Sequence, residues 1–197
     1  MTTAGLVLAA GAGRRLGRPK ALVRLRADGP TLVETAVERV RAAGCDDVVV
    51  VVGAAAGDVA DAVSATGAAV VTADDWAEGM GASLRAGLAH LEASTHDVAL
   101  VSLVDLPDVT AEVIRRVLSA VDEDGPAALA RAAYVEVPGH PVVLGRVHWA
   151  LVCATATGDR GARDFLARTP HRLVECGDLA TGRDVDTAAD VEREGRR

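Results

Sequence analysis

The segment DDVVVVVG, residues Asp46 to Gly53, carries five consecutive valines with no polar residue between them. A strand with one face in water alternates apolar and polar side chains, whereas a strand buried on both faces does not. This run is therefore typical of a central strand in a parallel sheet that helices cover on both sides.

Outward from this segment, apolar runs alternate with helical patterns, and no repeat or linker interrupts them. This alternation predicts a doubly wound α/β fold with ligands bound beyond the carboxyl ends of the strands. We expect a single domain over residues 1–197. The expected strands are 5–10, 47–52, 68–72, 98–104, 128–135, 141–144 and 172–175. The expected helices are 31–43, 57–65, 82–93, 110–121, 146–153 and 161–168, with a last helix starting near Thr187.

The composition excludes several classes of protein. The 197 residues carry a net charge of −7, which argues against general nucleic-acid binding. No apolar run approaches the roughly 20 residues that span a bilayer, and the first residues lack the basic start of a signal peptide. Three cysteines far apart in sequence suit a reducing compartment. We expect a cytoplasmic protein with no nucleic-acid or membrane partner.

Glycine and basic residues gather directly after the first expected strand, in LAAGAGRRLGRPKAL (Leu8 to Leu22). Glycines such as Gly11 and Gly13 let backbone amides approach a ligand, and Arg15 and Lys20 supply positive charge. Lys20 is also the only lysine of the chain. These features predict a phosphate-binding loop rather than a merely solvated basic loop.

Neither of the two commoner phosphate-binding motifs fits this loop. GxGxxG requires a third glycine at the position that Leu16 occupies, and the second expected strand ends at Gly53 without the acidic residue of a dinucleotide site. GxxxxGK[ST] requires a glycine directly before the lysine, where this chain has Pro19.

The segment LAAGAGRRLGRPK instead resembles the LAAGxxxRxGxxK signature of nucleotidyltransferases. Later segments resemble, in order, the MobA-like NTP transferases and specifically their molybdenum cofactor cytidylyltransferase branch, over nearly the whole chain. The resemblance implies a Rossmann-like, three-layer α/β fold with a mostly parallel central sheet. The first motif is widely shared, whereas GHP together with GDRGAR is more specific. The later segments are EGMGASLRAGL (78–88), LVDLPDV (103–109), GHPVVLGRVHW (139–149), GDRGARDFL (158–166) and DVDTAAD (184–190).

The resemblance also implies roles for individual residues. Arg15 and Lys20 would hold the triphosphate and, with Asp105, form the catalytic set. The first loop and EGMGASLRAGL would bind the nucleotide, and the GHP and GDRGAR segments would bind the acceptor. The nucleotide-binding residues would be Leu8, Ala9, Ala10, Gly11, Gly13, Gly79 and Ser83, and the acceptor-binding residues His140, Asp159 and Arg163.

Two aspartates are candidate Mg²⁺ ligands. Asp105 follows the apolar run DVALVSLV and so falls at the carboxyl end of a strand, where a carboxylate suits Mg²⁺. It also matches the metal-binding aspartate of the family, and Asp108 is better placed to cap the helix that begins near Thr110. Asp186 is the candidate second ligand, with a helix cap before Thr187 as an equal alternative.

Structural roles compete with binding roles at other positions. Ser83 is as well suited to cap its helix as to contact a ligand. Asp159 and Arg163 have the i,i+4 spacing of a surface pair, although the amino end of the helix that they open would also attract an anion. His140 lies between Gly139 and Pro141 rather than on an apolar helix face, which favours a role in a site.

These features predict nucleotidyl transfer, in which an acceptor phosphate attacks the α-phosphorus of a nucleoside triphosphate and pyrophosphate leaves. This chemistry depends on positioning and charge neutralisation. The resemblance implies a molybdopterin-type acceptor, and CTP over GTP because LAAG, with Ala10, replaces LAGG. It further implies Mg²⁺ as cofactor and a molybdenum hydroxylase or its maturation factor as partner. The alternatives are a sugar phosphate or methylerythritol phosphate acceptor, a GTP-using guanylyltransferase, and a non-catalytic nucleotide- or cofactor-binding protein.

Overall fold

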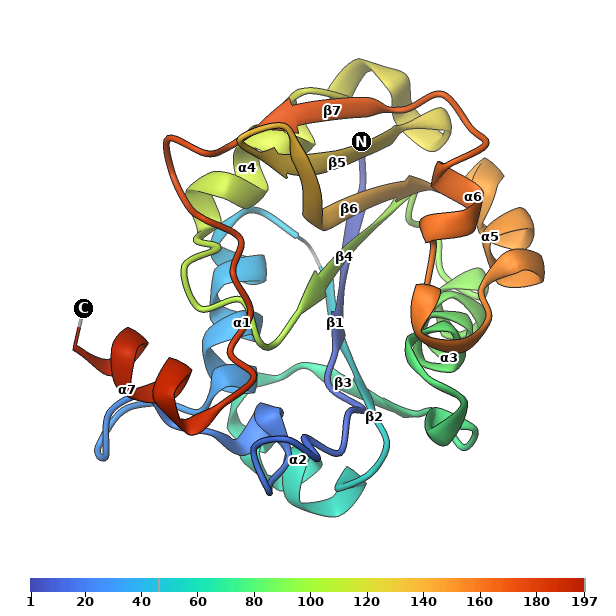
Figure 1. Cartoon of the computed structure of the whole chain (residues 1–197). Coiled ribbons are helices and arrows are strands. Elements are labelled where there is room, and N and C mark those ends of the chain that lie inside the picture. The colour runs from blue at the N-terminus through green and yellow to red at the C-terminus, as the bar shows by residue number, and fades with distance from the viewer. Residues whose placement is uncertain (46, 197) are drawn as a thin grey trace.

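The computed structural model describes residues 1–45 and 47–196 and is built around one seven-stranded sheet (Figure 1). Its strands lie in the order β3-β2-β1-β4-β6-β5-β7. All neighbouring strands are parallel except at β6, which runs antiparallel to both β4 and β5. The mostly parallel sheet expected from the sequence is therefore confirmed. The strands are β1 Thr3–Leu8, β2 Asp47–Val52, β3 Ala69–Thr72, β4 Val98–Leu103, β5 Leu129–Tyr134, β6 Val137–Gly145 and β7 Arg172–Glu175.

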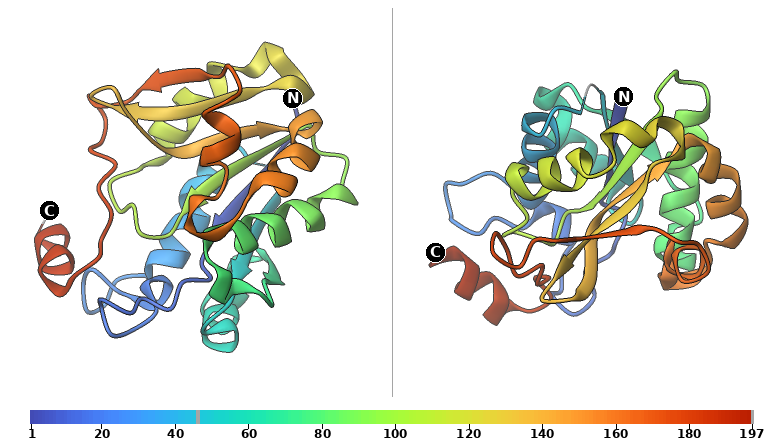
Figure 2. Two further views of the ribbon diagram at one scale, coloured as in Figure 1. Left: turned by 45° about the vertical axis from the view of Figure 1, so that its right-hand side comes forward. Right: turned by 90° about the horizontal axis from the view of Figure 1, so that it is seen from above.

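Helices cover both faces of this sheet (Figures 1 and 2). Helices α1, α2 and α4 supply buried side chains on one face, and α3, α5 and α6 supply them on the other. Helix α7 stands away from the sheet at the end of an extended segment (Figure 2). The α-helices are α1 Leu32–Ala42, α2 Ala56–Val63, α3 Met80–Glu92, α4 Ala111–Ser119, α5 Trp149–Thr155, α6 Arg163–Leu166 and α7 Ala188–Gly195. Short 3-10 helices span Lys20–Leu22, Ser64–Thr66, Trp76–Glu78, Asp122–Ala127, Arg146–His148 and Gly158–Arg160.

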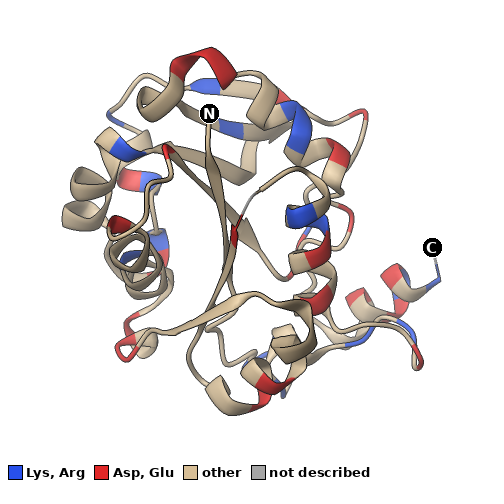
Figure 3. Cartoon of the chain, turned by 180° about the vertical axis from the view of Figure 1, so that it is seen from behind, with Lys and Arg blue, Asp and Glu red and all other residues tan. Residues whose placement is uncertain are grey.

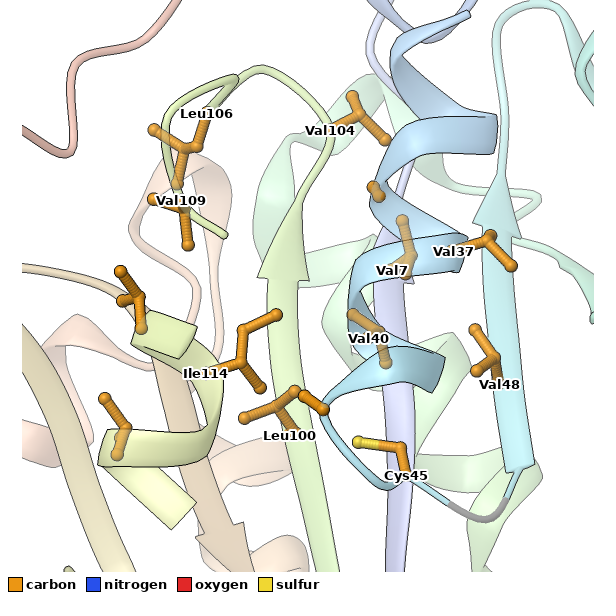
Figure 4. Close-up of a cluster of buried hydrophobic side chains, with 14 of the residues drawn as sticks. Val7, Val37, Val40, Cys45, Val48, Leu100, Val104, Leu106, Val109 and Ile114 are labelled. Carbon is orange, nitrogen blue, oxygen red and sulfur yellow. The ribbon is translucent and has the colours of Figure 1, made fainter. Parts of the chain in front are cut away.

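The five valines of β2 show why this sheet is buried on both sides. Val48 and Val50 pack into the core under α1, whereas Val49 and Val51 pack into the core under α3. Alternate side chains of a strand point to opposite faces, so an unbroken valine run supplies both cores at once. Figure 4 shows the first core, where Val40 of α1 lies over the strands.

Three segments differ from the sequence-based expectation. Strand β6 begins at Val137 rather than at 141, because Val137 and Pro138 pair with β5 beside an irregularity in register where proline is tolerated. Residues 146–148 form a 3-10 turn, so α5 begins at Trp149. Helix α6 has only four residues and follows Gly161, whose φ of 52° is not helical.

The helix caps correct two further expectations. Thr187 caps α7 in a reciprocal capping box with Asp190, so Asp186 is not the cap. Ser83 does not cap α3, because Gly79 occupies that position and Ser83 lies buried inside the first turn. Helix capping therefore does not explain the presence of Asp186 or Ser83 at these positions.

Charged residues lie mainly on the helices and loops around the sheet (Figure 3). Among the described residues, we find no helix with the length and apolar character needed to cross a membrane.

The two-residue turn between β5 and β6 holds non-glycine residues in the left-handed region. Val135 and Glu136 have φ values of 52° and 65°. The carboxylate of Glu175 stabilises this unfavourable backbone, because it accepts hydrogen bonds from the N–H groups of Val135 and Glu136 at 2.9 and 3.0 Å. The backbone N–H groups of Glu136, Val135 and Gly177 accordingly lower the pKa of Glu175.

We expect the double substitution Val135→Asn and Glu136→Gly to stabilise the protein. Asn-Gly is the preferred pair for such a turn, and each left-handed residue costs about 1–2 kcal/mol. Val135 is 79% exposed, so little packing is lost. Urea unfolding should show a gain of ~1–2 kcal/mol in the free energy of unfolding. Glu136→Ala, which keeps the unfavourable φ, should show no gain, and a gain of equal size there would contradict this explanation.

Candidate active site

A pocket of about 400 Å³ lies beyond the carboxyl ends of β1 and β4, where the sequence predicted a ligand. Its floor is the end of each strand, Leu8 and Leu103. Glycine-rich loop residues close one side and the start of α3 closes another. The structure therefore brings together all of the expected nucleotide-binding residues, together with Lys20, Asp105 and Asp159. These expected residues are Leu8, Ala9, Ala10, Gly11, Gly13, Gly79 and Ser83.

The pocket also contains residues that the sequence analysis did not select. Trp76 and Met80 line it from the segment before and at the start of α3, and Arg14 lines it from the first loop. Trp76 is partly buried and is one of only two tryptophans. A rare aromatic residue in a polar segment (DDWAEG) was the signal that could have identified Trp76.

The first loop folds back on itself at Gly13. Gly13 has a φ of 61°, and a Cβ at this position would lie 1.9 Å from the carbonyl oxygen of Arg18. The Leu16 backbone N–H donates to the Gly13 carbonyl at 3.0 Å, which closes the turn. Only glycine fits this close approach, and the resulting bend carries the chain back to place Lys20 at the pocket.

Three carboxylates meet beside this pocket, whose lining includes Asp105 but not Asp184 or Asp186. Asp105, Asp184 and Asp186 each offer an oxygen, and these atoms lie within 4.8 Å of one another. Asp184 was not selected from the sequence, although it precedes Asp186 by two positions in DVDTAAD. The set supplies only hard oxygen donors, which fit a small divalent cation such as Mg²⁺ or Mn²⁺.

Lys20 lies among these carboxylates. Its Nζ donates to Asp105 Oδ2 at 2.7 Å and to Asp186 Oδ1, and Arg15 Nη1 donates to Asp186 Oδ2 at 2.8 Å. Burial by itself would lower the pKa of Lys20, but the two carboxylates together raise it above its usual value. In return, the hydrogen bond from Lys20 and the charge of Arg15 lower the pKa of Asp186.

The C-terminal segment reaches the pocket through contacts with the loop after β4. The Val185 N–H donates to the Asp105 carbonyl at 2.9 Å. Asp108 Oδ2 accepts from both the N–H and the hydroxyl of Thr181, at 2.7 and 2.6 Å. Asp108 therefore attaches the C-terminal segment to the loop after β4. It is not the helix cap expected from the sequence, because Thr110 occupies the cap position of α4.

The expected acceptor-binding residues divide into two places. Asp159 lines the pocket, and its Oδ1 lies 2.4 Å from where a Cβ on Gly79 would be. His140 and Arg163 lie outside the pocket lining, on β6 and at the start of α6. The alternative of a surface pair between Asp159 and Arg163 is not supported: among the described residues no salt bridge joins them, and the non-helical Gly161, with a φ of 52°, lies between them.

His140 has an unusual electrostatic environment. Burial, with the charges of Arg131 and Arg163, lowers the pKa of His140 to about 4. Its backbone is fixed by Tyr134, whose hydroxyl donates to the His140 carbonyl at 2.6 Å. The imidazole is therefore neutral at physiological pH.

Comparison with known proteins places this geometry in a family. The model of the MobA-like NTP transferase domain matches residues 5–173. The chain belongs to the MobA-like NTP transferase family. This confirms the resemblance on which the sequence-based assignment of the pocket depends.

Individual relatives of this MobA-like transferase carry different names. It is 40% identical over 199 residues to nicotine blue oxidoreductase of Paenarthrobacter nicotinovorans, covering 96% of this chain and 94% of the relative. It is 28% identical to Rv0371c of Mycobacterium tuberculosis H37Rv, whose structure is a complex with manganese, with a TM-score of 0.78 over 100% and 99% of the two chains. A nucleotidyl transferase from Methanothermobacter is 25% identical, with a TM-score of 0.77 over 98% and 95%.

The position of Lys20 predicts that it competes with a divalent cation for the carboxylates of this MobA-like transferase. We expect Lys20→Met to bind Mn²⁺ about tenfold more tightly than the parent in the absence of nucleotide, because Asp105 and Asp186 then lose the ammonium group that both contact. Calorimetric titration with Mn²⁺ measures this. Arg18→Met changes a cation in the same loop that is not among the groups around the carboxylates. Equal affinity in Lys20→Met and the parent would contradict the competition.

Proposed function

We propose that this protein transfers CMP from CTP to the phosphate of a molybdopterin-type acceptor and releases pyrophosphate. The observation that carries the proposal is the meeting of a glycine-rich loop, Lys20 and three carboxylates beside a nucleotide-sized pocket. Family membership supports the use of a nucleoside triphosphate. The agreement of the later motifs with the cytidylyltransferase branch supports the choice of base and acceptor.

In this proposal Asp105 and Asp186 hold Mg²⁺, with Asp184 beside them. The manganese complex of the mycobacterial relative supports a divalent cation in this family. Mg²⁺, when bound, supplies charge neutralisation at the phosphate oxygens. With Mg²⁺ on these carboxylates, Lys20 would be free to contact the β- and γ-phosphates together with Arg15 and the amides of the first loop.

The proposed reaction requires no general base from the protein. A phosphate oxygen of the acceptor is already ionised at neutral pH and forms the new bond to the α-phosphorus. The bond between the α-phosphorus and its bridging oxygen breaks, and pyrophosphate carries away the electron pair. The residues of the chain act by holding the two phosphates in line and neutralising charge.

The choice of CTP is supported by Ala10. Ala10 and Trp76 both line the pocket, and they lie so close to Gly53 that a Cβ there would be 2.8 Å from Ala10 Cβ and 2.6 Å from Trp76 Cβ, so this part of the site is tightly packed. We propose that this tight packing favours a pyrimidine over a purine and that Trp76 contacts the base. Ser83 and Gly79 complete the nucleotide site, and His140, Asp159 and Arg163 bind the acceptor.

A second candidate function is oxidoreduction. The relative named nicotine blue oxidoreductase is 40% identical to this chain, and its name describes a reaction without nucleotidyl transfer. A dinucleotide such as NADPH would meet the same amides and cations as a triphosphate, although the loop lacks the GxGxxG spacing of the usual dinucleotide site. A requirement for divalent metal separates the two functions, because hydride transfer does not require the three carboxylates to bind a cation.

The deciding experiment measures pyrophosphate release and NADPH oxidation on the same preparation. With Mg²⁺ and molybdopterin, we expect pyrophosphate release from CTP with a kcat/KM at least ~100-fold above that for GTP, about the discrimination of a pocket that differs by one methyl group. Asp105→Asn should abolish this release while preserving the fold. Metal-independent oxidation of NADPH by nicotine blue, without pyrophosphate release, would replace the first proposal by the second. Equal use of CTP and GTP would remove the role of Ala10.

Lys20, the only lysine of the chain, can be tested by a substitution that keeps its charge. Lys20→Arg keeps the charge but exchanges a compact ammonium for a planar fork, which cannot occupy the same place among phosphate oxygens. We expect kcat to fall on the order of 100-fold, as small misplacements of a reacting group do. The matched control is Arg18→Lys, an exposed position in the same loop, which should turn over like the parent. Parent-like turnover by Lys20→Arg would show that any cation suffices at this position.

A further inference from the structure

Strand β5 carries a cation in an unusual place. Arg131 is the only charged residue of LARAAY, and it is partly buried. It pairs across the sheet with Val142, which packs in the core under α3, α5 and α6, so Arg131 points to that face of the sheet. Its Nε donates to the Gly139 carbonyl at 3.3 Å, directly before His140. Burial lowers the pKa of Arg131, as does the nearby charge of Arg163.

Two further polar groups lie near Arg131. His140 directly follows the Gly139 carbonyl that Arg131 contacts, and the charges of Arg131 and Arg163 both act on its imidazole. Arg163 begins α6, which packs on this face through Phe165 and Leu166. Among the residues that the structure describes, no carboxylate forms a salt bridge with Arg131 or Arg163, whereas the neighbouring Arg160 is paired with Asp164.

This cluster lies beside the nucleotide pocket. Val101 of β4 pairs with Val142 of the antiparallel β6, so the segment of β6 that precedes Val142, which includes His140, lies toward the end of β4 where Leu103 lines the pocket floor. Strands are about 4.8 Å apart, which places β5 roughly 10 Å from β4 along the same face. Asp159 and Arg163 belong to one short segment, which therefore joins the pocket to the cluster.

We propose that Arg131, Arg163 and His140 form a binding site for a phosphate monoester and hold the acceptor by that group. The role in the reaction rests on the proposed function, but the binding of phosphate does not. Two guanidinium groups offer forked N–H donors that match phosphate oxygens and balance a dianion. Neutral His140 adds one N–H donor without a third positive charge. A single carboxylate would leave one cation unbalanced, so the charge favours phosphate.

The electrostatics of this cluster give a reason for the assignment. Two like charges close together, one of them partly removed from water, disfavour the folded state unless an anion joins them. Bound phosphate removes that cost, so binding should stabilise the protein by mass action. Arg131 was missed in the sequence because a lone arginine in a short apolar run resembles a surface-facing strand position.

The test uses inorganic phosphate as the probe, with no nucleotide and no turnover. Calorimetry on Lys20→Met, which removes the lysine of the nucleotide loop, should still detect one phosphate. Adding Arg131→Met or Arg163→Met should weaken this binding at least tenfold. Arg168→Met, another exposed arginine near α6, is the matched control and should leave it unchanged. Because Arg163 is exposed, its variant tests the site even where Arg131→Met fails to fold.

A second measurement connects the site to the reaction. With CTP and molybdopterin, Arg131→Met should raise the KM for the acceptor at least tenfold and leave the KM for CTP within twofold. Unchanged phosphate binding in both Arg131→Met and Arg163→Met would overturn the proposal, as would an equal rise in both KM values. Loss of phosphate binding in these variants, with no pyrophosphate release from the parent, would support the anion site and overturn the nucleotidyl-transfer function instead.

Discussion

The contact of one ammonium group with two carboxylates joins three segments that are far apart in sequence. Lys20 comes from the first loop, Asp105 from the end of β4 and Asp186 from the segment before α7. Each segment reaches this point for a separate structural reason. Gly13 bends the first loop back, β4 ends beside β1, and the Val185 N–H attaches the C-terminal segment to the Asp105 carbonyl. The pocket depends on this contact because Lys20 connects the three segments that meet beside it.

The same contact explains how an acidic cluster remains stable without a ligand. Three carboxylate oxygens within 4.8 Å of one another repel strongly unless a cation lies between them. Lys20 and Arg15 provide that charge from within the chain. In the proposed reaction, a metal would replace Lys20 at the carboxylates, and the triphosphate would give Lys20 a new anionic partner. Such an exchange would leave every charge of the cluster compensated, which a metal or a nucleotide alone would not achieve.

The sequence predicted those features that depend on local patterns. Three local patterns were sufficient. The unbroken valines predicted the buried strand β2, and the glycines predicted the loop that lines the pocket. The apolar run before Asp105 predicted its place at the end of a strand. The sequence-based predictions were wrong where a residue distant in sequence binds a side chain that local spacing had assigned to a nearby helix. Asp108 has the spacing of a helix cap but binds Thr181, 73 residues away. Asp184 gave no local signal of its own, and Trp76 could have been identified only by its rarity. Arg14 and Arg15 are adjacent, and only the folded loop shows that Arg14 lines the pocket while Arg15 reaches Asp186.

The reversed direction of β6 explains how the proposed phosphate site can lie at the same edge of the sheet as the pocket. A parallel strand presents only its carboxyl end to the ligand edge, and its preceding residues lie within the sheet. Because β6 is antiparallel to β4, it enters the sheet from that edge, and its first residues, including His140, lie beside the end of β4. The two-residue turn joins the end of β5 to the start of β6, so these two strands lie side by side at this edge. The strained backbone of Val135 and Glu136 therefore belongs to the turn that brings Arg131 into contact with the segment containing His140.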